Sequence, residues 1–476
     1  MVTKKLWGSS QLRNCTVELT ATEVVLQCNG TQKVIWLEDI IGCYMSVSDQ
    51  NIAVLTAYTK ITDTTSSGDR HRKHFKLKFS DQQVLNQWLD EVRSKIAVPS
   101  PLHQRVNHSG RRLLVLINPH SGTGNAMRVY QRQVAPILEE AGVESVLLVT
   151  EATNHAQQIV RQLDLSTFDG VVTVSGDGLA HEVINGLMQR EDRDTALRFP
   201  IGVVPSGTGN GLAAAICFHS EQVYKPKNFK EFARQCALII ARPRYVDLPI
   251  MHVETAQDNL ASFMGVSYGL IADIDIGSEK LRGLCGASRF VIYALLNIAR
   301  LKSYRVRLHH LPHGTVTADR HQAPELDPWR SSYAEVGSEV PPLSEPVPQS
   351  WRTEEDDFVL VFVASLSHLA SDCWLVPNAN LSENDLYLLT IRQRAATRLN
   401  VFRVLNQLEA GTHLSLPALE MIPVKAVRLE PLSTAASITV DGEEIRSSVV
   451  QAVATARTAT VMAKYSSTVP RSKAID

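Results

Sequence analysis

Several features that define large protein classes are scarce in this chain of 476 residues. Its seven cysteines are scattered and form no Cys-x-x-Cys pair, which favours reduced thiols over disulfides or a zinc site. The formal net charge of −1 provides no global positive field, so we expect no nucleic-acid partner. No apolar run reaches the ~18 residues that a membrane-spanning helix requires.

Targeting motifs and the common nucleotide motifs are also missing. The N-terminal residues Met-Val-Thr-Lys-Lys lack the apolar core of a signal peptide, and Val2 stands where myristoylation requires glycine. No glycine loop ends in the Lys-Ser/Thr of a Walker A motif, and no Val-Ala-Ile-Lys strand or Asp-Phe-Gly turn indicates a protein-kinase fold. We therefore expect a cytoplasmic protein, and the chain length predicts about two to four domains.

Residues 1–97 are predicted to form a small β domain. Polar and apolar residues alternate in short stretches, for example over 74–79, which is typical of half-buried strands. One amphipathic helix follows, with Leu85, Trp88 and Val92 on its apolar face. Strands closed by one helix with a central Trp resemble a pleckstrin-homology-like (PH-like) domain. A small β domain of another kind is the alternative.

A linker of proline and polar residues is expected over 98–111. Over 112–245 buried strands alternate with helical stretches, which predicts a Rossmann-like α/β domain with a parallel sheet covered on both faces. The strands are expected at 113–117, 146–149, 171–174 and 201–204, and the helices at 125–141, 154–163 and 179–190. Glycine loops follow these strands, at the sheet edge where open α/β domains bind ligands.

Residues 246–465 are predicted to form an antiparallel β-sandwich domain, because strands return without regular helical crossovers. These strands are expected at 247–253, 261–268, 304–311, 358–365, 386–392, 425–430 and 436–440, with helices near 287–302 and 395–410. The stretch 313–353 is rich in Pro, Ser, Glu and Asp and is expected to be a mobile insertion. Residues 466–476 are expected to be a frayed tail.

Two of the loops contain almost no bulky side chains. Residues 118–124 (NPHSGTG) follow the first strand of the α/β domain, and residues 206–210 (SGTGN) follow the fourth. Glycine allows backbone amides to approach a phosphate closely. The first loop differs from a dinucleotide-binding fingerprint, because Met127 occupies the position of the third glycine. A purely structural turn is the alternative for this loop.

The remaining loop, Ser175-Gly176-Asp177-Gly178, places one acid between two glycines. An Asp-Gly turn that only caps a helix is the usual explanation of such a pair. Here the turn ends a buried strand and begins an amphipathic helix. A carboxylate at the positive end of a helix is expected to be ionised and able to accept a hydroxyl proton.

Together and in this order, the three loops resemble the diacylglycerol-kinase catalytic domain superfamily, and within it the sphingosine kinases. The resemblance extends over about 112–465, except for the poorly matched stretch 313–345. Its most specific parts are 175–186, 207–210, 269–275 with Arg289 and Phe290, 345–348 with Trp351, 357–360 and 440–443. The related NAD kinases have Gly-Gly-Asp-Gly-Thr, whereas this chain has Ser175 and Leu179 at the first and last positions, which favours the lipid branch.

The resemblance implies roles for the matching residues. Asp177 would be the general base on a primary hydroxyl, and Asp275 would pair with the amine of a sphingoid base. The nucleotide would be held by Asn118, Pro119, His120, Thr150, Asn154, Glu182, Gly207, Thr208, Gly209, Arg282, Arg289, Asp441, Gly442 and Glu443. The lipid would also contact Ser175, Gly176, Ile271 and Phe290. The family spaces its two arginines one residue closer than 282 and 289, and the Mg²⁺ ligands stay unassigned.

Structural alternatives exist for several of these residues. Asp275 could be a surface carboxylate at a strand end, and Asp441-Gly442 could be a simple hairpin turn. His120 and His181 are interpreted as loop and helix-start residues, because no second histidine stands at ligand spacing. The apolar helix 289–301 could be a core helix, or it could line a pocket for an alkyl chain together with Ile271.

The sequence therefore predicts an ATP- and Mg²⁺-dependent kinase for sphingosine or a related sphingoid base, with transient contact to membranes. A ceramide or diacylglycerol kinase is the alternative within this class, although such lipids lack a free amine for Asp275. A non-catalytic lipid- or membrane-binding protein is the alternative from another class. The intact Asp177 and both glycine loops argue against it. The oligomeric state stays open, with a homodimer among the options.

Overall fold

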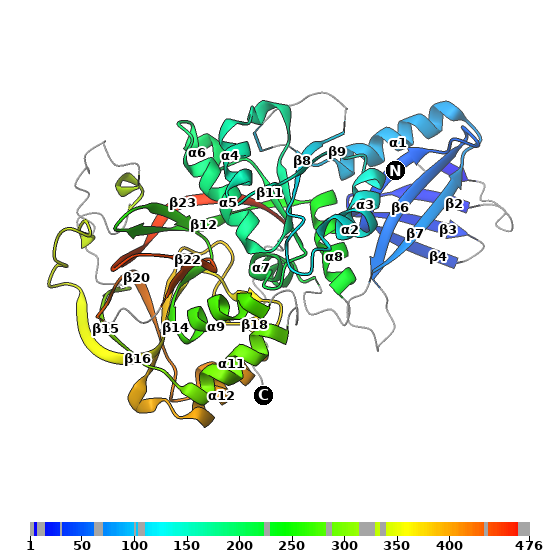
Figure 1. Cartoon of the computed structure of the whole chain (residues 1–476). Coiled ribbons are helices and arrows are strands. Elements are labelled where there is room, and N and C mark those ends of the chain that lie inside the picture. The colour runs from blue at the N-terminus through cyan, green and yellow to red at the C-terminus, as the bar shows by residue number, and fades with distance from the viewer. Residues whose placement is uncertain are drawn as a thin grey trace.

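The computed structural model describes residues 4–6, 15–28, 31–60, 70–99, 101–102, 110–222, 229–281, 288–313, 329–333, 339–432 and 437–464. Figure 1 shows three units: an N-terminal β unit, a central α/β unit and an antiparallel β unit. The predicted mixed α/β class is thereby confirmed. Among the described helices, none has the length and apolar character that crossing a bilayer requires.

The N-terminal unit contains two antiparallel sheets and one helix. The sheets comprise β1 (Lys4–Leu6), β2 (Cys15–Leu19), β3 (Glu23–Cys28) and β4 (Thr31–Trp36), then β5 (Ile40–Met45), β6 (Ile52–Lys60) and β7 (Arg70–Lys78). Helix α1 (Gln82–Ile96) begins where the Asp81 side chain accepts a hydrogen bond from Gln83 N. As the apolar periodicity predicted, α1 buries Leu85, Trp88 and Val92 against these sheets.

The N-terminal unit packs directly on the central unit. The Tyr58 hydroxyl donates to Glu140 at 3.2 Å, and Arg242 donates to the Ile40 carbonyl at 2.8 Å. A Cβ built on Gly42 would lie 1.9 Å from the Glu140 carbonyl oxygen, so the two backbones touch. The contact therefore leaves no room for a side chain at residue 42.

The central unit contains the predicted parallel sheet. Its strands are β8 (Arg112–Ile117), β9 (Glu144–Val149), β10 (Val171–Ser175) and β11 (Ile201–Pro205), in the order β9-β8-β10-β11. Helices α3 (Ala135–Glu140), α4 (His155–Gln162) and α5 (Asp177–Met188) agree with the predicted positions. Two further helices, α7 (Gly211–His219) and α8 (Phe229–Ala241), follow β11 and were not predicted. Nearly all residues of α7 are buried, which removes the polar face that would mark this helix in the sequence. Helix α8 keeps a polar face with Lys230, Glu231 and Arg234.

The antiparallel unit is joined to the parallel sheet by one long strand. Its main strands are β12 (Arg244–Thr255), β14 (Gly265–Gly269), β15 (Tyr304–Pro312), β16 (Arg352–Ala364), β19 (Leu386–Arg392), β20 (Glu420–Pro431) and β21 (Ile438–Val440). Strand β23 (Val450–Ala463) was not predicted, and it pairs with β20, β12 and β11. The chain thus returns from the second unit into the edge of the first sheet, and 14 strands form one sheet.

One prediction for this unit is corrected by the structure. The strand predicted at 261–268 is split into β13 (Asn259–Ser262) and β14, with a turn between them. The stretch 313–353, expected to be a mobile insertion, contains packed side chains where it is described: Tyr333, Val340 and Trp351 are buried against Leu311. Burial of these large apolar groups offsets the entropy cost of ordering the segment. The tail 466–476 lies outside the described residues.

Candidate active site

The central unit and the antiparallel unit together line one cavity of about 1130 Å³. The predicted site residues on its wall are Asn118, His120, Thr150, Ser175, Gly176, Asp177, Glu182, Gly207, Thr208, Gly209, Ile271, Asp275, Arg289, Phe290, Asp441, Gly442 and Glu443. Pro119 and Asn154, which were predicted to contact the nucleotide, are not on this wall. Arg282 lies outside the described residues.

Asp177 lies at the start of two helices. It is the first residue of α5, and its side chain also caps α7. Oδ2 accepts a hydrogen bond from Gly211 N at 2.8 Å, and Oδ1 accepts one from Leu212 N at 3.0 Å. Two helix N-termini therefore face one carboxylate, and both favour its ionised form.

Burial nevertheless raises the pKa of Asp177 from 3.8 to about 6, although the amides of Leu212 and Gly211 oppose this shift. The sequence predicted an acid kept ionised by its helix, whereas the structure shows that desolvation has the larger effect. A carboxyl group with a pKa near 6 is still mostly ionised at pH 7. It is also more basic than an exposed aspartate, which suits a general base.

The three glycine loops meet through their backbones. Gly176 N donates to Ser121 Oγ at 3.0 Å, and a Cβ built on Gly207 would lie 2.4 Å from Gly176 Cα. The Gly207 amide is used inside its own loop, where it donates to Asn210 Oδ1 at 3.0 Å. Among the described residues, the amides of Thr208 and Gly209 find no acceptor. These two amides are therefore able to reach a phosphate.

Glu182 lies one turn after the base on α5 and binds the start of α4. Its Oε2 accepts a hydrogen bond from Ala156 N at 3.0 Å. Burial raises the pKa of Glu182, while the amides of Asn154 and Ala156 oppose the shift. Asn154 has a left-handed φ of 62° at the helix start. Its backbone amide contacts Glu182, and its predicted contact with the nucleotide stays a prediction.

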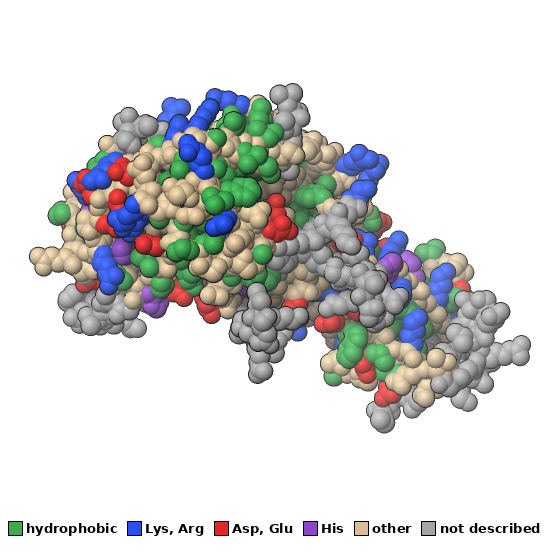
Figure 2. Space-filling model, turned by 90° about the horizontal axis from the view of Figure 1, so that it is seen from below, with side chains coloured by type: hydrophobic (Ala, Val, Ile, Leu, Met, Phe, Trp, Pro, Cys, Tyr) green, Lys and Arg blue, Asp and Glu red, His purple; other side chains and the backbone are tan. Residues whose placement is uncertain are grey.

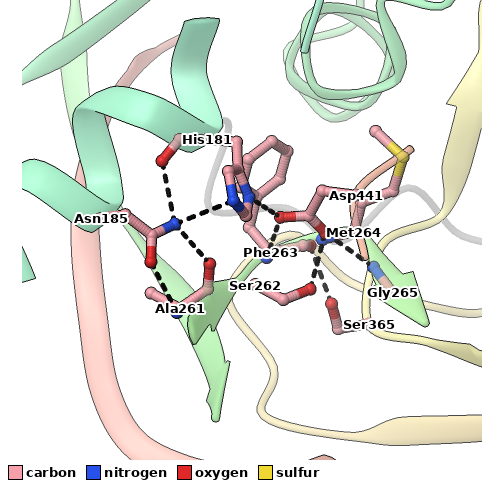
Figure 3. Close-up of polar contacts among 9 residues, drawn as sticks. All are labelled: His181, Asn185, Ala261, Ser262, Phe263, Met264, Gly265, Ser365 and Asp441. Atoms are coloured by element: carbon pink, nitrogen blue, oxygen red, sulfur yellow. Dashed lines mark hydrogen bonds and ion pairs between the residues drawn. The ribbon is translucent and has the colours of Figure 1, made fainter. Parts of the chain in front are cut away.

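Asp441 belongs to the turn between β21 and β22 (Glu443–Ile445) and is fully enclosed (Figure 3). Its Oδ2 accepts a hydrogen bond from His181 Nδ1 at 2.8 Å, and its Oδ1 accepts one from Ser262 Oγ at 2.6 Å. Burial alone would raise the pKa of Asp441, but His181 and these donors hold it below its ordinary value. Burial would likewise lower the pKa of His181, and the Asp441 carboxylate outweighs that effect and raises it.

The apolar part of the cavity wall comes mainly from α9 (Leu270–Ser278), α11 (Ser288–Arg300) and α12 (Arg398–Gln407). Asp275 lies on α9 near the 441–443 turn, since a Cβ built on Gly442 would be 3.3 Å from Asp275 Oδ2. The apolar wall residues include Ile271, Ile274, Phe290, Ala294, Leu295, Ile298, Phe362, Leu369, Phe402, Leu405 and Leu408. The helix predicted over 289–301 thus lines the cavity and is only partly a core helix.

Arg289, predicted to lie at the phosphates, is on the cavity wall and is paired with an acid. Its guanidinium group forms an ion pair with Glu279 and lies 4.6 Å from the centre of the Phe290 ring. Its side chain is only 3% exposed. The charge of this arginine is thus already neutralised by a neighbour, which reduces its attraction for a phosphate.

Acidic side chains dominate the charged part of the cavity. The carboxylates on the wall are Glu151, Asp177, Glu182, Asp275, Glu279, Asp372, Asp441, Glu443 and Glu444. Arg289 is the one Lys or Arg on the described wall, and it is paired. No group of three metal-ligating side chains is assembled in the described part of the chain. The cavity therefore suits ligands that bring their own positive charge.

Sequence reasoning did not identify several residues that shape this site. They are Ser121, His181, Asn185, Gly211, Leu212, Ser262 and the apolar residues of α12. Ser121 could have been found because it lies inside the first glycine loop. His181 was interpreted as a helix-start residue, and its partner lies 260 positions away, so no local pattern reveals the contact.

Comparisons with known proteins identify the family of this chain. The diacylglycerol kinase catalytic domain matches residues 112–242, and the YegS C-terminal NAD kinase beta sandwich-like domain matches residues 265–463. Sphingosine kinase 1 of Homo sapiens is 36% identical over 344 residues, which cover 71% of this chain and 88% of that protein. Sphingosine kinase 1 of Arabidopsis thaliana is 31% identical over 369 residues, with 77% and 72% covered. The chain belongs to the sphingosine kinase family of lipid kinases.

Proposed function

We propose that this chain transfers the γ-phosphate of ATP to the primary hydroxyl of sphingosine or a related sphingoid base. The position of Asp177 supports this most directly. Its basic carboxylate lines the same cavity as the Gly207–Gly209 loop, as Asp275 and as the apolar side of α11. A base, a phosphate loop, an acid and an apolar wall are the groups that phosphorylation of an aliphatic amino alcohol requires.

In this mechanism Asp177 accepts the proton of the substrate hydroxyl. The hydroxyl oxygen forms a bond to the γ-phosphorus while the bond between that phosphorus and the β–γ bridging oxygen breaks, and ADP leaves. The amides of Thr208 and Gly209 hold the phosphates during this step. The proton on Asp177 passes to solvent after the phosphorylated lipid departs. Since the pKa of Asp177 is about 6, this release is favourable at neutral pH.

The acidic cavity wall fits a nucleotide that arrives with Mg²⁺. This ion favours oxygen ligands and is usually held by substrate phosphates with one or two carboxylates. Glu443 would provide such a carboxylate, because it lies beside the loop that contains Asp177. Its Oε1 is 2.8 Å from the position of a Cβ built on Gly178, the residue after that acid. Bound Mg²⁺ would neutralise charge on the phosphates and so assist their approach to the acidic wall.

The amine of a sphingoid base would lie near Asp275. A cation in this cavity experiences attraction from the many carboxylates on the wall, whereas a neutral head group does not. The alkyl chain would lie among the apolar side chains of α11 and α12. At about 0.8 kcal/mol for each buried CH₂ group, a long chain provides ample affinity.

Ceramide and diacylglycerol kinases are the alternatives within this class. Their substrates carry no amine, so the negative field around Asp275 would give them no added affinity. Asp275 and the acidic wall therefore favour a sphingoid base. A non-catalytic lipid-binding protein would not require an enclosed aspartate with a raised pKa, so Asp177 argues against that alternative.

We further propose that the enzyme contacts membranes at the outer side of α11 and α12. Here the exposed apolar side chains Val291, Ile292, Leu295, Leu296, Leu399 and Phe402 lie next to the apolar part of the cavity. Figure 2 shows hydrophobic side chains gathered on this lower face of the molecule. A lipid substrate could pass from a bilayer into the cavity across such a surface.

The domain limits that we propose are 1–97 for a PH-like unit, 112–245 for the nucleotide-binding domain and 246–465 for the lipid-binding domain. Seven strands in two sheets, followed by the single helix α1, support a PH-like assignment. The family models leave residues 1–111 unmatched, so this unit is an addition to the catalytic core. A homodimer is compatible with this arrangement.

The deciding experiment incubates the purified full-length chain with labelled ATP and four lipids separately. We expect label in sphingosine and dihydrosphingosine and little in ceramide or diacylglycerol. Transfer to the neutral lipids but not to sphingosine would overturn the substrate assignment. Intact ATP binding without transfer to any lipid would favour the non-catalytic alternative.

A further inference from the structure

We propose that Asp441 binds neither nucleotide nor metal. Its contact with His181 instead joins the central unit to the antiparallel unit, and we call this contact the latch. His181 is then a positioning residue for the kinase reaction. The catalytic part of this inference rests on the proposed function. The resemblance assigned Asp441 to the nucleotide, and His181 was assigned no role beyond its helix. The contacts in Figure 3 support different roles for these two residues.

The Asp441 carboxylate has no acceptor capacity left for a ligand. Its five donors are His181 Nδ1 at 2.8 Å, Ser262 Oγ at 2.6 Å, Phe263 N at 3.3 Å, Met264 N at 2.9 Å and Gly265 N at 3.0 Å. A carboxylate offers about four lone-pair sites. Its side chain is also 0% exposed, so a phosphate or a metal ion could reach it only by displacing these donors.

A second side chain on α5 strengthens the same contact. Asn185, one turn after His181, donates to the Ala261 carbonyl at 2.9 Å and accepts from the Ala261 amide at 2.9 Å. Ala261 belongs to β13, just before the turn that encloses Asp441. Helix α5 is therefore joined to the second unit at two successive turns, through one charged and one neutral pair.

This latch connects groups that must be placed relative to each other. Asp177 is at the start of α5, and the latched turn continues into Gly442 and Glu443. A Cβ built on Gly442 would lie 3.3 Å from Asp275 Oδ2, and a Cβ built on Gly178 would lie 2.8 Å from Glu443 Oε1. His181 and Asp441 thus set the position of the base against the residues expected to meet the amine and the metal-bound nucleotide. A small shift of one unit would misplace the reacting atoms.

A double-mutant cycle tests the proposal. We expect His181→Phe to lower kcat about tenfold to 100-fold, with KM for ATP within about threefold, because the chemistry loses alignment while the phosphate loop is intact. His181→Asn, which keeps a donor near the Nδ1 position, should recover most of the lost rate. Asp441→Asn should lower kcat similarly. The double variant His181→Phe/Asp441→Asn should be little worse than the poorer single variant, because both changes break the same contact.

The half-exposed pair of His313 Nε2 and Asp385 Oδ1, 3.2 Å apart and not on the cavity wall, provides a control, although Asp385 also pairs with Lys425. His313→Phe and Asp385→Asn should leave kcat unchanged. Losses that multiply fully in the His181 and Asp441 cycle would overturn the latch. A tenfold or greater loss of ATP affinity in Asp441→Asn, absent from His181→Phe, would likewise restore Asp441 as a nucleotide ligand.

Two measurements keep this test separate from the proposed function. The same cycle is measured in binding of Mg²⁺ with a non-hydrolysable ATP analogue, and in chemical unfolding of the full-length variants. Non-additive unfolding free energies with preserved nucleotide binding support the latch even if sphingosine is not the substrate. Additive unfolding free energies would overturn it even if sphingosine kinase activity is found. If Asp441→Asn fails to fold, His181→Phe, His181→Asn and Asn185→Ala keep the comparison possible.

Discussion

Asp177 Oδ2 and Gly211 N are 2.8 Å apart and form a hydrogen bond between two different loops of the parallel sheet. Asp177 ends the loop after β10, and Gly211 begins the helix that follows the loop after β11. The acid of one loop thus caps the helix of the next. This bond fixes the acid beside the Gly207–Gly209 backbone. A Cβ built on Gly209 would be 3.2 Å from the same oxygen.

Replacing this acid is expected to abolish turnover in a chain that still folds, with some loss of stability because asparagine has one acceptor oxygen for the amides of Gly211 and Leu212. Asp177→Asn keeps the shape of the side chain but has no basic oxygen, so kcat should fall about 100-fold to 10,000-fold. Steady-state kinetics and calorimetric binding of ATP measure the two effects separately. Asp192→Asn, at an exposed ion pair with Arg190 outside the cavity, is the matched control and should retain its turnover. Near-normal activity of Asp177→Asn would reject the base assignment.

The pH dependence of the reaction should report the same group. Since burial raises the pKa of Asp177 to about 6, the base is protonated below that pH, and kcat/KM should fall about tenfold per pH unit there. The folded state binds this proton more tightly than the unfolded chain does. The contribution of Asp177 to the free energy of unfolding is therefore fully present below about pH 4 and is lost as pH rises through about 6. An acid limb with a midpoint near 4 would contradict the raised pKa.

Two alanine substitutions probe the contact between the glycine loops from opposite sides. In Gly207→Ala the new Cβ would lie 2.4 Å from Gly176 Cα, so the backbone must move, and we expect about 1–3 kcal/mol of lost stability together with weaker ATP binding. In Gly176→Ala the new Cβ would lie 3.4 Å from Gly207 Cα, an ordinary contact. The cost in unfolding free energy should then be below about 1 kcal/mol. Equal destabilisation of both variants in urea unfolding would contradict this account.

Asp275→Asn is expected to change substrate selectivity. Removing the carboxylate near the proposed amine site should lower kcat/KM for sphingosine about 30-fold or more, by analogy with loss of one partner from an enclosed charge pair. N-acetylated sphingosine is a ceramide without a cationic amine, so its rate should be low from the start. That low rate provides the internal comparison and should change little. An equal loss on both lipids would remove the amine-recognition role.

The outer side of α11 and α12 is expected to determine membrane binding. Ile292, Leu296 and Leu399 are 38%, 43% and 55% exposed and do not line the cavity. Their joint replacement by Gln should weaken sedimentation with phospholipid vesicles at least about tenfold, because three apolar contacts are lost. Turnover of a short-chain, water-soluble sphingoid base should be retained.

The exposed pair Val34 and Trp36 on β4 is the matched control for this surface. Their replacement by Gln should leave vesicle binding intact. If that variant loses binding and the α11 and α12 variant does not, the membrane contact belongs to the N-terminal unit instead.

Much of the site could be predicted because parallel strands align the loops that follow them. The strands before Asn118, Ser175 and Ser206 are runs of β-branched and aliphatic residues, and such runs indicate buried parallel strands directly. Once those strands are parallel, their carboxyl ends meet at one edge, so the glycine loops and Asp177 had to lie together. The apolar helix over 289–301 was equally visible. Its position on the cavity wall was one of two alternatives, the other being a core helix.

The sequence by itself determined the local chemistry: where strands end, where backbone amides are uncovered, and where one acid follows a strand. Only the tertiary structure decided how strongly burial shifts the pKa of that acid, that Arg289 pairs with Glu279, and that His181 and Asp441 meet across 260 positions. The physical reason is that desolvation and long-range hydrogen bonds depend on which surfaces close over a group. In this protein the groups that close over Asp177 and His181 come from segments far away in the sequence, the start of α7 and the turn after β21.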